Sequence, residues 1–426
     1  MSFLIAAPAS GSGKTVTTAG IVAALRARGA PVTAAKVGPD YIDPGYLTAA
    51  AGSPAINLDL WAMRPGLVDH LAAREHLVVE GVMGLFDGPA VGIGSSADIA
   101  RRYGLPVVLV VSAERQSHSV AALIHGFATF DPTIRVAGVI LTRVASERHA
   151  AMLGDAVART SVPLLGRIPR HAALTLPSRH LGLHQAAERT DLATWVTTLG
   201  ETIAAHVDLA ALAELASSGA PPPPSAAAAA PPPLPPLGNR IALAADEAFA
   251  FTYTHIVDGW HRAGASVHRF SPLAGEAPDP AADAVILPGG YPELHAARLA
   301  ANRPWIDGLH AAAARGATIY GECGGYMALG RTLVDAEGSG HAMAGLLPIE
   351  TSFAAPRRTL GYRALTHDGA LFPQHLKGHE FHYATIDAEG PPLFEARDAA
   401  GARIGPIGTR AGTVAGSFAH IIDFTD

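Results

Sequence analysis

Short apolar runs that alternate with helix-like stretches constrain the fold of this 426-residue chain more than any other feature. In the first half, Thr15–Arg28 and Ser117–Phe127 are typical of helices. The apolar runs, which we expect to be strands, are Phe3–Ala7, Val32–Lys36, Leu77–Glu80, Val107–Val111, Ala137–Thr142 and Leu164–Ile168. Strands that are apolar throughout and alternate with helices are typical of a parallel sheet covered on both faces. The sequence therefore predicts an α/β fold with a doubly wound sheet.

A Pro- and Ala-rich segment at residues 216–238 divides the chain. Because this composition cannot bury a core, we expect an extended, semi-rigid linker; peptide recognition by the polyproline is the alternative. The strand pattern then recurs at Ile241–Ala245, Ala284–Leu287 and Thr318–Tyr320, before a final third rich in strands and turns. We therefore expect two α/β domains, at residues 1–215 and 239–426.

Composition excludes several classes of function. The net charge is −6 and there is no basic run, so we expect no nucleic-acid partner and no attraction to anionic lipid. A single cysteine excludes an intrachain disulfide and a Cys-based zinc cluster, and it favours a reducing cytoplasm. We also find no signal-peptide pattern and no apolar stretch near the roughly 20 residues that span a bilayer. The sequence predicts a cytoplasmic protein without a membrane partner.

The only cysteine, Cys323, lies in a Gly-x-Cys-x-Gly turn between a strand-like and a helix-like run. Flanking glycines let the chain reverse sharply while the cysteine holds strained backbone angles that expose its sulfur. The N–H groups of a following helix would favour the thiolate. We interpret Cys323 as a nucleophile; the alternative is a buried structural cysteine.

A nucleophilic cysteine needs a base, and two later segments offer histidines. One contains His379 and His382, and the other contains His420. We favour His420, which ends a strand-like run near the C-terminus. Upstream, Gly289 and Gly290 follow another strand-like run, where backbone N–H groups are suited to bind an oxyanion.

With these residues the second half resembles the class I (triad-type) glutamine amidotransferases. The resemblance implies that Cys323 forms a γ-glutamyl thioester and that His420 activates it. The oxyanion hole would then be formed by Gly289, Gly290 and Gly324. The usual third member of the triad is a Glu two residues after the histidine, whereas this chain has Ile422. The cobyric and cobyrinic acid synthase branch shares this departure, which leaves open what orients His420.

A phosphate-binding loop is predicted at Pro8–Thr15, after the first strand. The P-loop pattern Gly-x-x-x-x-Gly-Lys-Ser/Thr is met at its end, but Pro8 replaces the first glycine. Small residues let backbone N–H groups surround phosphates, Lys14 neutralises their charge, and the Thr15 hydroxyl can bind Mg²⁺. The predicted ATP site consists of Ser10, Gly11, Ser12, Gly13, Lys14, Thr15 and Lys36.

Acidic residues follow the next two predicted strands, at the edge where ligands bind in open α/β sheets. We predict that Asp40 and Glu80 bind Mg²⁺ together with Thr15, because Mg²⁺ prefers hard oxygen ligands. Asp43 and Asp87 lie a few residues further on, and we expect them on loops that face the γ-phosphate. The alternative for all four acids is helix capping or loop solvation.

The first half resembles the dethiobiotin synthetase-like ATPases, and Gly38–Pro44 and Glu80–Gly88 are similar to segments of the cobyrinic acid a,c-diamide synthases. This resemblance covers the chain except the linker. It implies ATP- and glutamine-dependent amidation, through an acyl phosphate and ammonia, of the a and c acetates of cobyrinate or hydrogenobyrinate in cobalamin biosynthesis. Residues near the acyl phosphate or the tetrapyrrole would be Tyr41, Asp43 and Asp87. We expect a homodimer.

Other functions would use similar motifs. A nickel sirohydrochlorin a,c-diamide synthase would share all of them. A cobyric acid synthase-type amidotransferase is disfavoured by the Gly-Pro-Asp-Tyr-Ile-Asp segment that begins at Gly38. A P-loop switch with a decayed glutaminase domain would have lost its nucleophile or its base, and both residue types remain.

Overall fold

The computed structural model describes residues 2–425 except 172–173, 177, 180–181 and 218–229. The chain forms two compact units. The first comprises Met1–Trp61 and Pro65–Pro231, and the second comprises Ala62–Arg64 and Pro232–Asp426. Most of the predicted linker lies outside the described residues, so its conformation stays a prediction.

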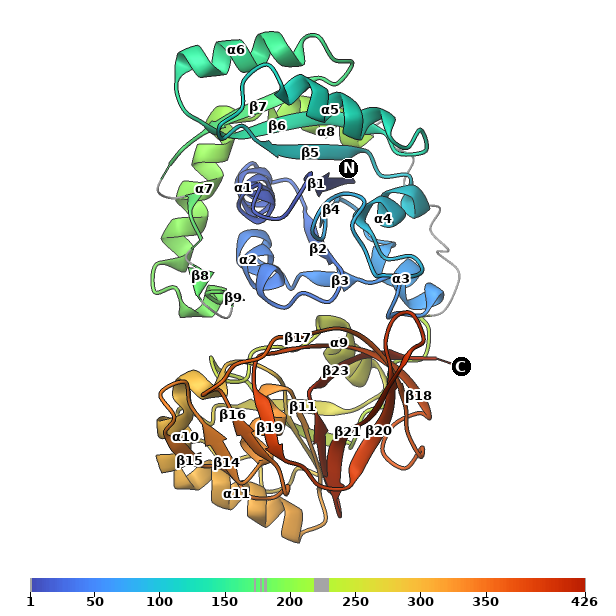
Figure 1. Ribbon diagram of the computed structural model, residues 1–426, viewed down its shortest axis with the longest axis vertical. Coiled ribbons are helices and arrows are strands. Elements are labelled where there is room, and N and C mark those ends of the chain that lie inside the picture. Colours follow the sequence, from blue (N-terminus) through green and yellow to red (C-terminus); the bar gives the residue numbers. More distant parts are fainter. Residues whose placement is uncertain (1, 172–173, 177, 180–181, 218–229, 426) are drawn as a thin grey trace. The chain divides into compact units, whose positions relative to one another are not determined.

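A seven-stranded parallel sheet forms the centre of the first unit, in the order β3-β2-β4-β1-β5-β6-β7 (Figure 1). Its strands are β1 (Phe3–Ala6), β2 (Thr33–Val37), β3 (Ile56–Leu58), β4 (Leu77–Glu80), β5 (Val107–Ser112), β6 (Val136–Val144) and β7 (Leu164–Pro169). All six predicted strands of this half are present. Within this sheet the sequence pattern missed only β3, which is too short to produce a recognisable apolar run.

Helices cover both faces of this sheet. Because successive side chains of a strand point to opposite sides, each central strand contributes to two hydrophobic cores. Val108 and Val110 of β5 belong to a core with α1, α2, α7 and α8, whereas Leu109 and Val111 belong to a core with α5 and α6. The helices are α1 (Lys14–Ala27), α2 (Ile42–Ala51), α3 (Pro65–Ala72), α4 (Ser96–Tyr103), α5 (Val120–Thr129), α6 (Glu147–Val157), α7 (Leu192–His206) and α8 (Leu209–Ser217). In Figure 1, α1 and α7 lie side by side on one face, and the two helices are in contact. The doubly wound prediction is confirmed.

The second unit is built on a ten-stranded mixed sheet in the order β11-β10-β12-β13-β22-β21-β20-β17-β18-β23. Its strands are β10 (Arg240–Ala244), β11 (Ser266–Phe270), β12 (Ala284–Leu287), β13 (Thr318–Glu322), β17 (Thr359–Thr366), β18 (His375–His382), β20 (Pro392–Arg397), β21 (Arg403–Ala411), β22 (Val414–Ser417) and β23 (Ala419–Phe424). The strands from β11 to β22 in this order pair in parallel, and the rest pair antiparallel. The three predicted strands correspond to β10, β12 and β13.

Shorter elements complete the second unit. A four-stranded sheet contains β14 (Thr332–Val334), β15 (Gly340–Ala342), β16 (Glu350–Ser352) and β19 (Thr385–Ala388). The helices are α9 (Thr254–Arg262), α10 (Ala296–Ala301), α11 (Arg303–Ala314), α12 (Gly324–Leu329) and the 3₁₀ helix η3 (Pro292–His295). Leu234 is buried in the same core as Ile241 and Leu243, so packing of this unit begins within the segment that composition alone reads as linker.

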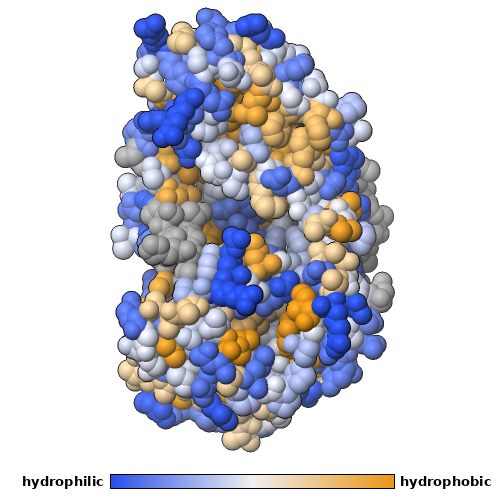
Figure 2. Space-filling model, in the orientation of Figure 1, coloured by the Kyte–Doolittle hydropathy of each residue, from blue (hydrophilic) through white to orange (hydrophobic). Residues whose placement is uncertain are grey.

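Apolar side chains on the face shown in Figure 2 form separate groups among hydrophilic ones. The exposed large apolar residues are spread over both units and include Val91, Phe130, Leu294 and Leu360. Such scattered exposure is normal for a folded chain and marks no single surface. In the described parts of the chain, no helix is both long enough and apolar enough to cross a membrane.

Candidate active sites

Cys323 occupies a sharp turn between β13 and α12. Its φ is 47° and its ψ is −104°, a region that residues other than glycine rarely adopt. The Cys323 N–H donates to the carbonyl of Ser417 at 2.8 Å, which ties the turn to β22. The thiol donates to the carbonyl of Phe381 on β18 at 3.8 Å. The strained backbone predicted from the flanking glycines is therefore present, but Cys323 is buried and not exposed as we expected.

Two glycines allow this turn because no Cβ atom fits at either position. A Cβ on Gly321 would lie 2.7 Å from the carbonyl carbon of Gly325, and a Cβ on Gly325 would overlap the carbonyl oxygen of Leu287. Both contacts are with backbone atoms, so no side-chain rotation relieves them. The sharp approach of α12 to β12 and β13 thus requires glycine at both positions.

The predicted base, His420 of β23, and the nucleophile Cys323 both lie close to Gly289. A Cβ on Gly289 would overlap Cε1 of His420, and it would lie 3.0 Å from Nε2 of His420 and 3.3 Å from Cβ of Cys323. The imidazole and the thiol-bearing residue therefore border the same small space, which exists because Gly289 lacks a side chain. Residues that are 97 positions apart in sequence come together here because β22 pairs with β13 and leads directly into β23.

The two alternative histidines lie on β18. His379 is the cross-strand neighbour of His420. His382 is engaged elsewhere: its Nε2 lies 3.0 Å from Oε1 of Glu380, its Nδ1 lies 3.0 Å from the carbonyl of Ala384, and its ring stacks on Phe418. The geometry supports the choice of His420 as the base.

Burial sets the protonation states of this pair. Loss of hydration raises the pKa of the Cys323 thiol far above its usual value, although the backbone N–H of Gly324 acts in the opposite direction. The same effect lowers the pKa of His420 to about 3, so its imidazole is neutral near pH 7. A neutral imidazole beside a protonated thiol is the state in which the histidine can accept the proton.

Gly290 and Gly324 lie close together beside the nucleophile. A Cβ on Gly324 would lie 3.0 Å from the nitrogen of Gly290. The loop that contains Gly289 and Gly290 is fixed by a hydrogen bond of 2.9 Å from the N–H of Phe251 to the carbonyl of Gly289. The three glycines predicted to form an oxyanion hole are thus neighbours around Cys323, and such preorganised donors can stabilise an oxyanion.

In the first unit, the predicted phosphate loop connects β1 to α1. Gly11 and Gly13 have φ values of 80° and 90°, which favour glycine. The ammonium group of Lys14 donates to the carbonyl of Met83 at 2.6 Å, and Met83 itself has a φ of 44°. This curled loop at the start of a 14-residue helix is a form that binds anions through free N–H groups.

Two residues that the sequence reading did not assign to the site support this loop. The hydroxyl of Thr142 donates to the carbonyl of Ser12 at 2.8 Å, and the guanidinium of Arg143 donates to the carbonyl of Gly11 at 2.7 Å. Both lie in β6, at the carboxyl edge of the sheet. The only sequence signal for them is that position, since side chains at this edge meet the ligand-binding loops.

Buried charges cluster at the end of β2 and β4. The ammonium group of Lys36 lies 2.5 Å from Oδ2 of Asp43 and 3.0 Å from Oε1 of Glu80. Oε1 of Glu80 also accepts the Thr15 hydroxyl at 2.7 Å. Burial raises the pKa of Glu80 to about 7, with Lys36 acting in the opposite direction. Residues predicted for ATP and for Mg²⁺ therefore form one connected group.

Asp43 differs from the sequence-based expectation. We expected it on a loop, but it lies in the first turn of α2 and is buried. The helix begins this early because Oδ1 of Asp40 accepts the N–H groups of Ile42 at 2.7 Å and Asp43 at 3.1 Å. Asp40 thus caps the start of the helix, which was the alternative to Mg²⁺ binding in the sequence analysis. Burial acts to raise the pKa of Asp43, but the charge of Lys36 holds it below its usual value.

The two other residues predicted for the substrate side are more accessible. Asp87 is exposed on the loop after β4, where its Oδ2 accepts the N–H of Gly84 at 2.8 Å. Tyr41 is half-buried and immediately precedes α2. Of the predicted substrate-side acids, Asp87 alone keeps the loop position that we expected.

The oxygen donors of this cluster fit a magnesium ion. Thr15 and Glu80 are in direct contact, and Oε2 of Glu80 is buried without a hydrogen-bond partner among the described residues. A hydroxyl and carboxylates are the hard ligands that Mg²⁺ prefers, and Mg²⁺ at nucleotide sites uses few protein ligands. No group of three or more His, Cys, Asp or Glu side chains arranged for a metal occurs in the described ranges. With one hydroxyl and one carboxylate in direct contact, the site suits a metal that is held partly by phosphates.

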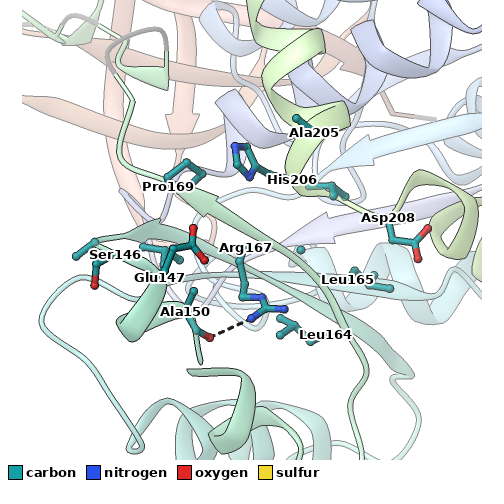
Figure 3. A pocket seen from close by; sticks show the side chains of 14 residues that line it. Ser146, Glu147, Ala150, Leu164, Leu165, Arg167, Pro169, Ala205, His206 and Asp208 are labelled. Carbon is teal, nitrogen blue, oxygen red and sulfur yellow. Dashed lines mark hydrogen bonds between the residues drawn. The ribbon is translucent and has the colours of Figure 1, made fainter. Parts of the chain in front are cut away.

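A separate groove of about 560 Å³ lies on the first unit (Figure 3). It is lined by residues of β7, α6, the end of α7 and the segment that follows α7, among them Glu147, Arg167, His206 and Asp208. Within it, Arg167 donates to the carbonyl of Ala150 at 3.2 Å. None of its lining residues belongs to the sites predicted from the sequence.

Comparison with known proteins identifies both halves of the chain. Residues 3–183 match the family model of the CobQ/CobB/MinD/ParA nucleotide binding domain, and residues 240–426 match that of the CobB/CobQ-like glutamine amidotransferase domain. These matches agree with the P-loop and amidotransferase assignments made from the sequence.

Full-length relatives narrow the family further. A hydrogenobyrinate a,c-diamide synthase of Brucella suis biovar 1 (strain 1330) is 53% identical over 99% of this chain and 98% of its own length. A protein of the same name from Rhizobium meliloti (strain 1021) is 51% identical over 99% of both chains. One from Rhodobacter capsulatus is 50% identical over 98% of both. With half or more of the aligned positions identical over nearly the full length of each relative, the chain belongs to the family of hydrogenobyrinate a,c-diamide synthases.

Proposed function

We propose that this protein uses ATP and glutamine to amidate the a and c acetate carboxylates of hydrogenobyrinate in cobalamin biosynthesis. Two candidate active sites in a member of this family support the proposal. One is the Cys323–His420 pair beside a glycine loop, and the other is the Thr15–Glu80–Lys36 cluster beside a phosphate loop. The protein is thus a glutamine-dependent ligase that forms C–N bonds.

The second unit releases ammonia from glutamine. Nε2 of His420 takes the proton from the thiol of Cys323, and the sulfur attacks the side-chain carboxamide of glutamine. The N–H groups of Gly290 and Gly324 stabilise the resulting oxyanion. His420 then returns its proton to the leaving ammonia, and water hydrolyses the γ-glutamyl thioester.

The first unit activates the carboxylate. A carboxylate is a poor electrophile, so the γ-phosphoryl group of ATP is first transferred to it, and ammonia displaces phosphate from the acyl phosphate. Residues Ser10 to Thr15 surround the phosphates, with Lys14 as their cation. We assign Asp87, which is exposed on the loop after β4, to the tetrapyrrole side. Tyr41 and Asp43 lie at the start of α2, at the same edge of the sheet.

Magnesium is the cofactor that these residues suit. Thr15 and Glu80 would hold it, with Asp43 close by and Asp40 at the start of α2. When bound, the ion supplies charge stabilisation for phosphoryl transfer. Lys36 keeps the surrounding carboxylates in place through its buried ion pairs.

The relatives are named for hydrogenobyrinate, which favours a metal-free corrinoid substrate over cobyrinate and over nickel sirohydrochlorin. The test is incubation of the purified protein with ATP, Mg²⁺ and glutamine, and with each tetrapyrrole in turn, followed by product mass analysis. We expect a diamide from hydrogenobyrinate, formed through a monoamide. A diamide from nickel sirohydrochlorin alone would overturn the assignment. The homodimer and the cytoplasmic location remain predictions, which light scattering and cell fractionation would check.

A further inference from the structure

A carboxylate lies beside the predicted base, although the sequence position of the usual triad acid holds Ile422. Oε2 of Glu322 is 3.7 Å from Nδ1 of His420. Oε1 of the same side chain accepts the backbone N–H of Ile421 at 3.0 Å. Glu322 is mostly buried, with 15% of its side chain exposed. One carboxyl group thus contacts both the backbone next to the histidine and the histidine ring.

The sheet explains why Glu322 reaches this position. Glu322 is the last residue of β13 and directly precedes Cys323. In the parallel pairing of β13 with β22, Glu322 is opposite Ser417, and β22 leads within two residues into β23. The strand that carries the nucleophile and the strand that carries the base therefore meet at Glu322.

The other charged groups around the imidazole come from β18. His379 and His382 act to lower the pKa of His420, and Glu380 acts to raise it. The charge of Glu380 is already compensated, because Arg363 lies 2.5 Å and His382 lies 3.0 Å from its carboxylate oxygens. Glu380 is therefore poorly suited to balance a charge on His420, which leaves Glu322 for that role.

We propose that Glu322 is the positioning residue of the glutaminase site. Its carboxylate, 3.7 Å from Nδ1 of His420, attracts the Nδ1–H through its charge, so that the lone pair of Nε2 is directed toward the thiol of Cys323. When Nε2 takes the thiol proton, the electron pair stays on sulfur, and the charge of the imidazolium is balanced by Glu322. When Nε2 passes that proton to the leaving ammonia, the site returns to its initial state. This inference rests on the proposed glutaminase activity.

Burial disfavours the charged form of each of these two groups when it is considered alone. Burial raises the pKa of Glu322 to about 8, although the N–H of Ile421 acts to lower it, and burial lowers the pKa of His420 to about 3. Each charge is costly alone in this environment, and opposite charges at short distance stabilise each other. An imidazolium therefore forms more readily beside an ionised Glu322 than beside a neutral amide.

The test is Glu322→Gln, which keeps the size of the side chain and an acceptor for the Ile421 N–H but removes the charge. We expect kcat for glutamine hydrolysis to fall about 100-fold or more, with little change in KM for glutamine and with ammonia-dependent amidation retained. Glu389→Gln is the matched control, since Glu389 accepts a hydrogen bond from Tyr326 of α12 but is not among the groups that act on His420. Its glutaminase activity should stay near wild type.

A second readout is independent of every substrate. Because Cys323 is the only cysteine, the rate of alkylation by iodoacetamide measures its thiolate directly. The charged groups that act on this thiol are Glu293 of η3, Glu380 of β18 and Glu322 itself. Direct repulsion by Glu322 acts to raise the pKa of the thiol, whereas its support of the His420 imidazolium favours the thiolate. The positioning role therefore predicts that the pH dependence of alkylation moves to higher pH in Glu322→Gln and stays unchanged in Glu389→Gln, and a move to lower pH would overturn it.

Three outcomes separate the possibilities. Wild-type kcat together with an unchanged alkylation profile in Glu322→Gln would overturn the positioning role. Equal loss of glutamine- and ammonia-dependent activity, with a lowered Tm and an unchanged alkylation profile, would overturn it in favour of a structural role. If the wild-type protein fails to hydrolyse glutamine, the proposed function fails, and the alkylation profiles still decide whether Glu322 acts on the Cys323–His420 pair.

Discussion

The hydroxyl of Thr15, at the start of α1, donates a hydrogen bond of 2.7 Å to Oε1 of Glu80, at the end of β4. The two residues are 65 positions apart in sequence, and each belongs to a different predicted motif. They meet because β1 and β4 are parallel neighbours in the sheet, so the loops after both strands leave from the same edge. This contact joins the phosphate loop to the acidic segment in one candidate site for ATP and its metal ion.

Loss of this site should lower amidation with both nitrogen donors, glutamine and ammonia. Lys14→Ala removes the cation of the phosphate loop, and Glu80→Gln removes a charge from the buried cluster. We expect amidation to fall about 100-fold or more with glutamine and with ammonia alike, because both need the acyl phosphate. Glu75→Gln, a change at a fully exposed side chain of the same unit, is the control. Normal ATP dependence in Lys14→Ala would refute the phosphate-loop assignment.

Loss of the nucleophile should lower amidation with glutamine but not amidation with ammonia. Cys323→Ala should lower glutamine-dependent amidation about 1000-fold or more and leave activity with a high concentration of ammonia near wild type. The reason is that Cys323 acts only before ammonia is released. Parallel assays with the two donors provide the measurement. Full glutamine-dependent turnover in the variant would eliminate Cys323 as nucleophile, and equal loss with both donors would indicate a structural role.

The base can be identified by comparing histidines. His420→Ala should lose glutamine use and keep ammonia use, because the buried thiol is protonated without a proton acceptor. His379→Ala removes the cross-strand neighbour of His420 and should retain substantial glutaminase activity. If the phenotypes of the two variants were exchanged, His379 rather than His420 would be the base.

Gly289 should not tolerate a methyl group. In Gly289→Ala the new Cβ would overlap the His420 ring, so the imidazole must move from its position beside Cys323. We expect loss of glutaminase activity with ammonia-dependent amidation retained. Gly340→Ala is the control in the same unit, because its Cβ would make only an ordinary contact of 3.6 Å with Thr332. Wild-type glutaminase activity in Gly289→Ala would show that this space is not the site of proton transfer.

Asp43 and Asp87, which the sequence grouped together, should now behave differently. Asp43→Asn breaks a buried ion pair with Lys36, so we expect a loss of about 3 kcal/mol or less in unfolding free energy, since Lys36 keeps Glu80, together with weaker ATP binding. Asp87 is exposed, so Asp87→Asn should keep ATP affinity and slow amidation or stall it at a monoamide. Calorimetry of ATP binding and product masses over time measure both effects. Identical behaviour of the two variants would contradict this separation.

The features that the sequence determined are local ones. The strands β1 and β5 are apolar on both faces because both faces are buried, so the apolar run itself predicts a strand. The turn at Cys323 is similarly encoded, because only glycine fits at Gly321 and Gly325. The phosphate loop was recognised because it needs small residues in sequential order. In each case the physical requirement acts within a few residues, and it therefore leaves a pattern in the sequence.

What only the tertiary structure decided involves contacts between distant segments. The sequence could not show that Lys36 pairs with Glu80, that Thr142 and Arg143 hold the phosphate loop, or that Glu322 lies beside His420. Each contact depends on which strands are neighbours and on their register, and this pairing is set by the packing of the whole core. A carboxylate next to a cysteine in sequence has many possible partners, and the junction of β13, β22 and β23 selects His420.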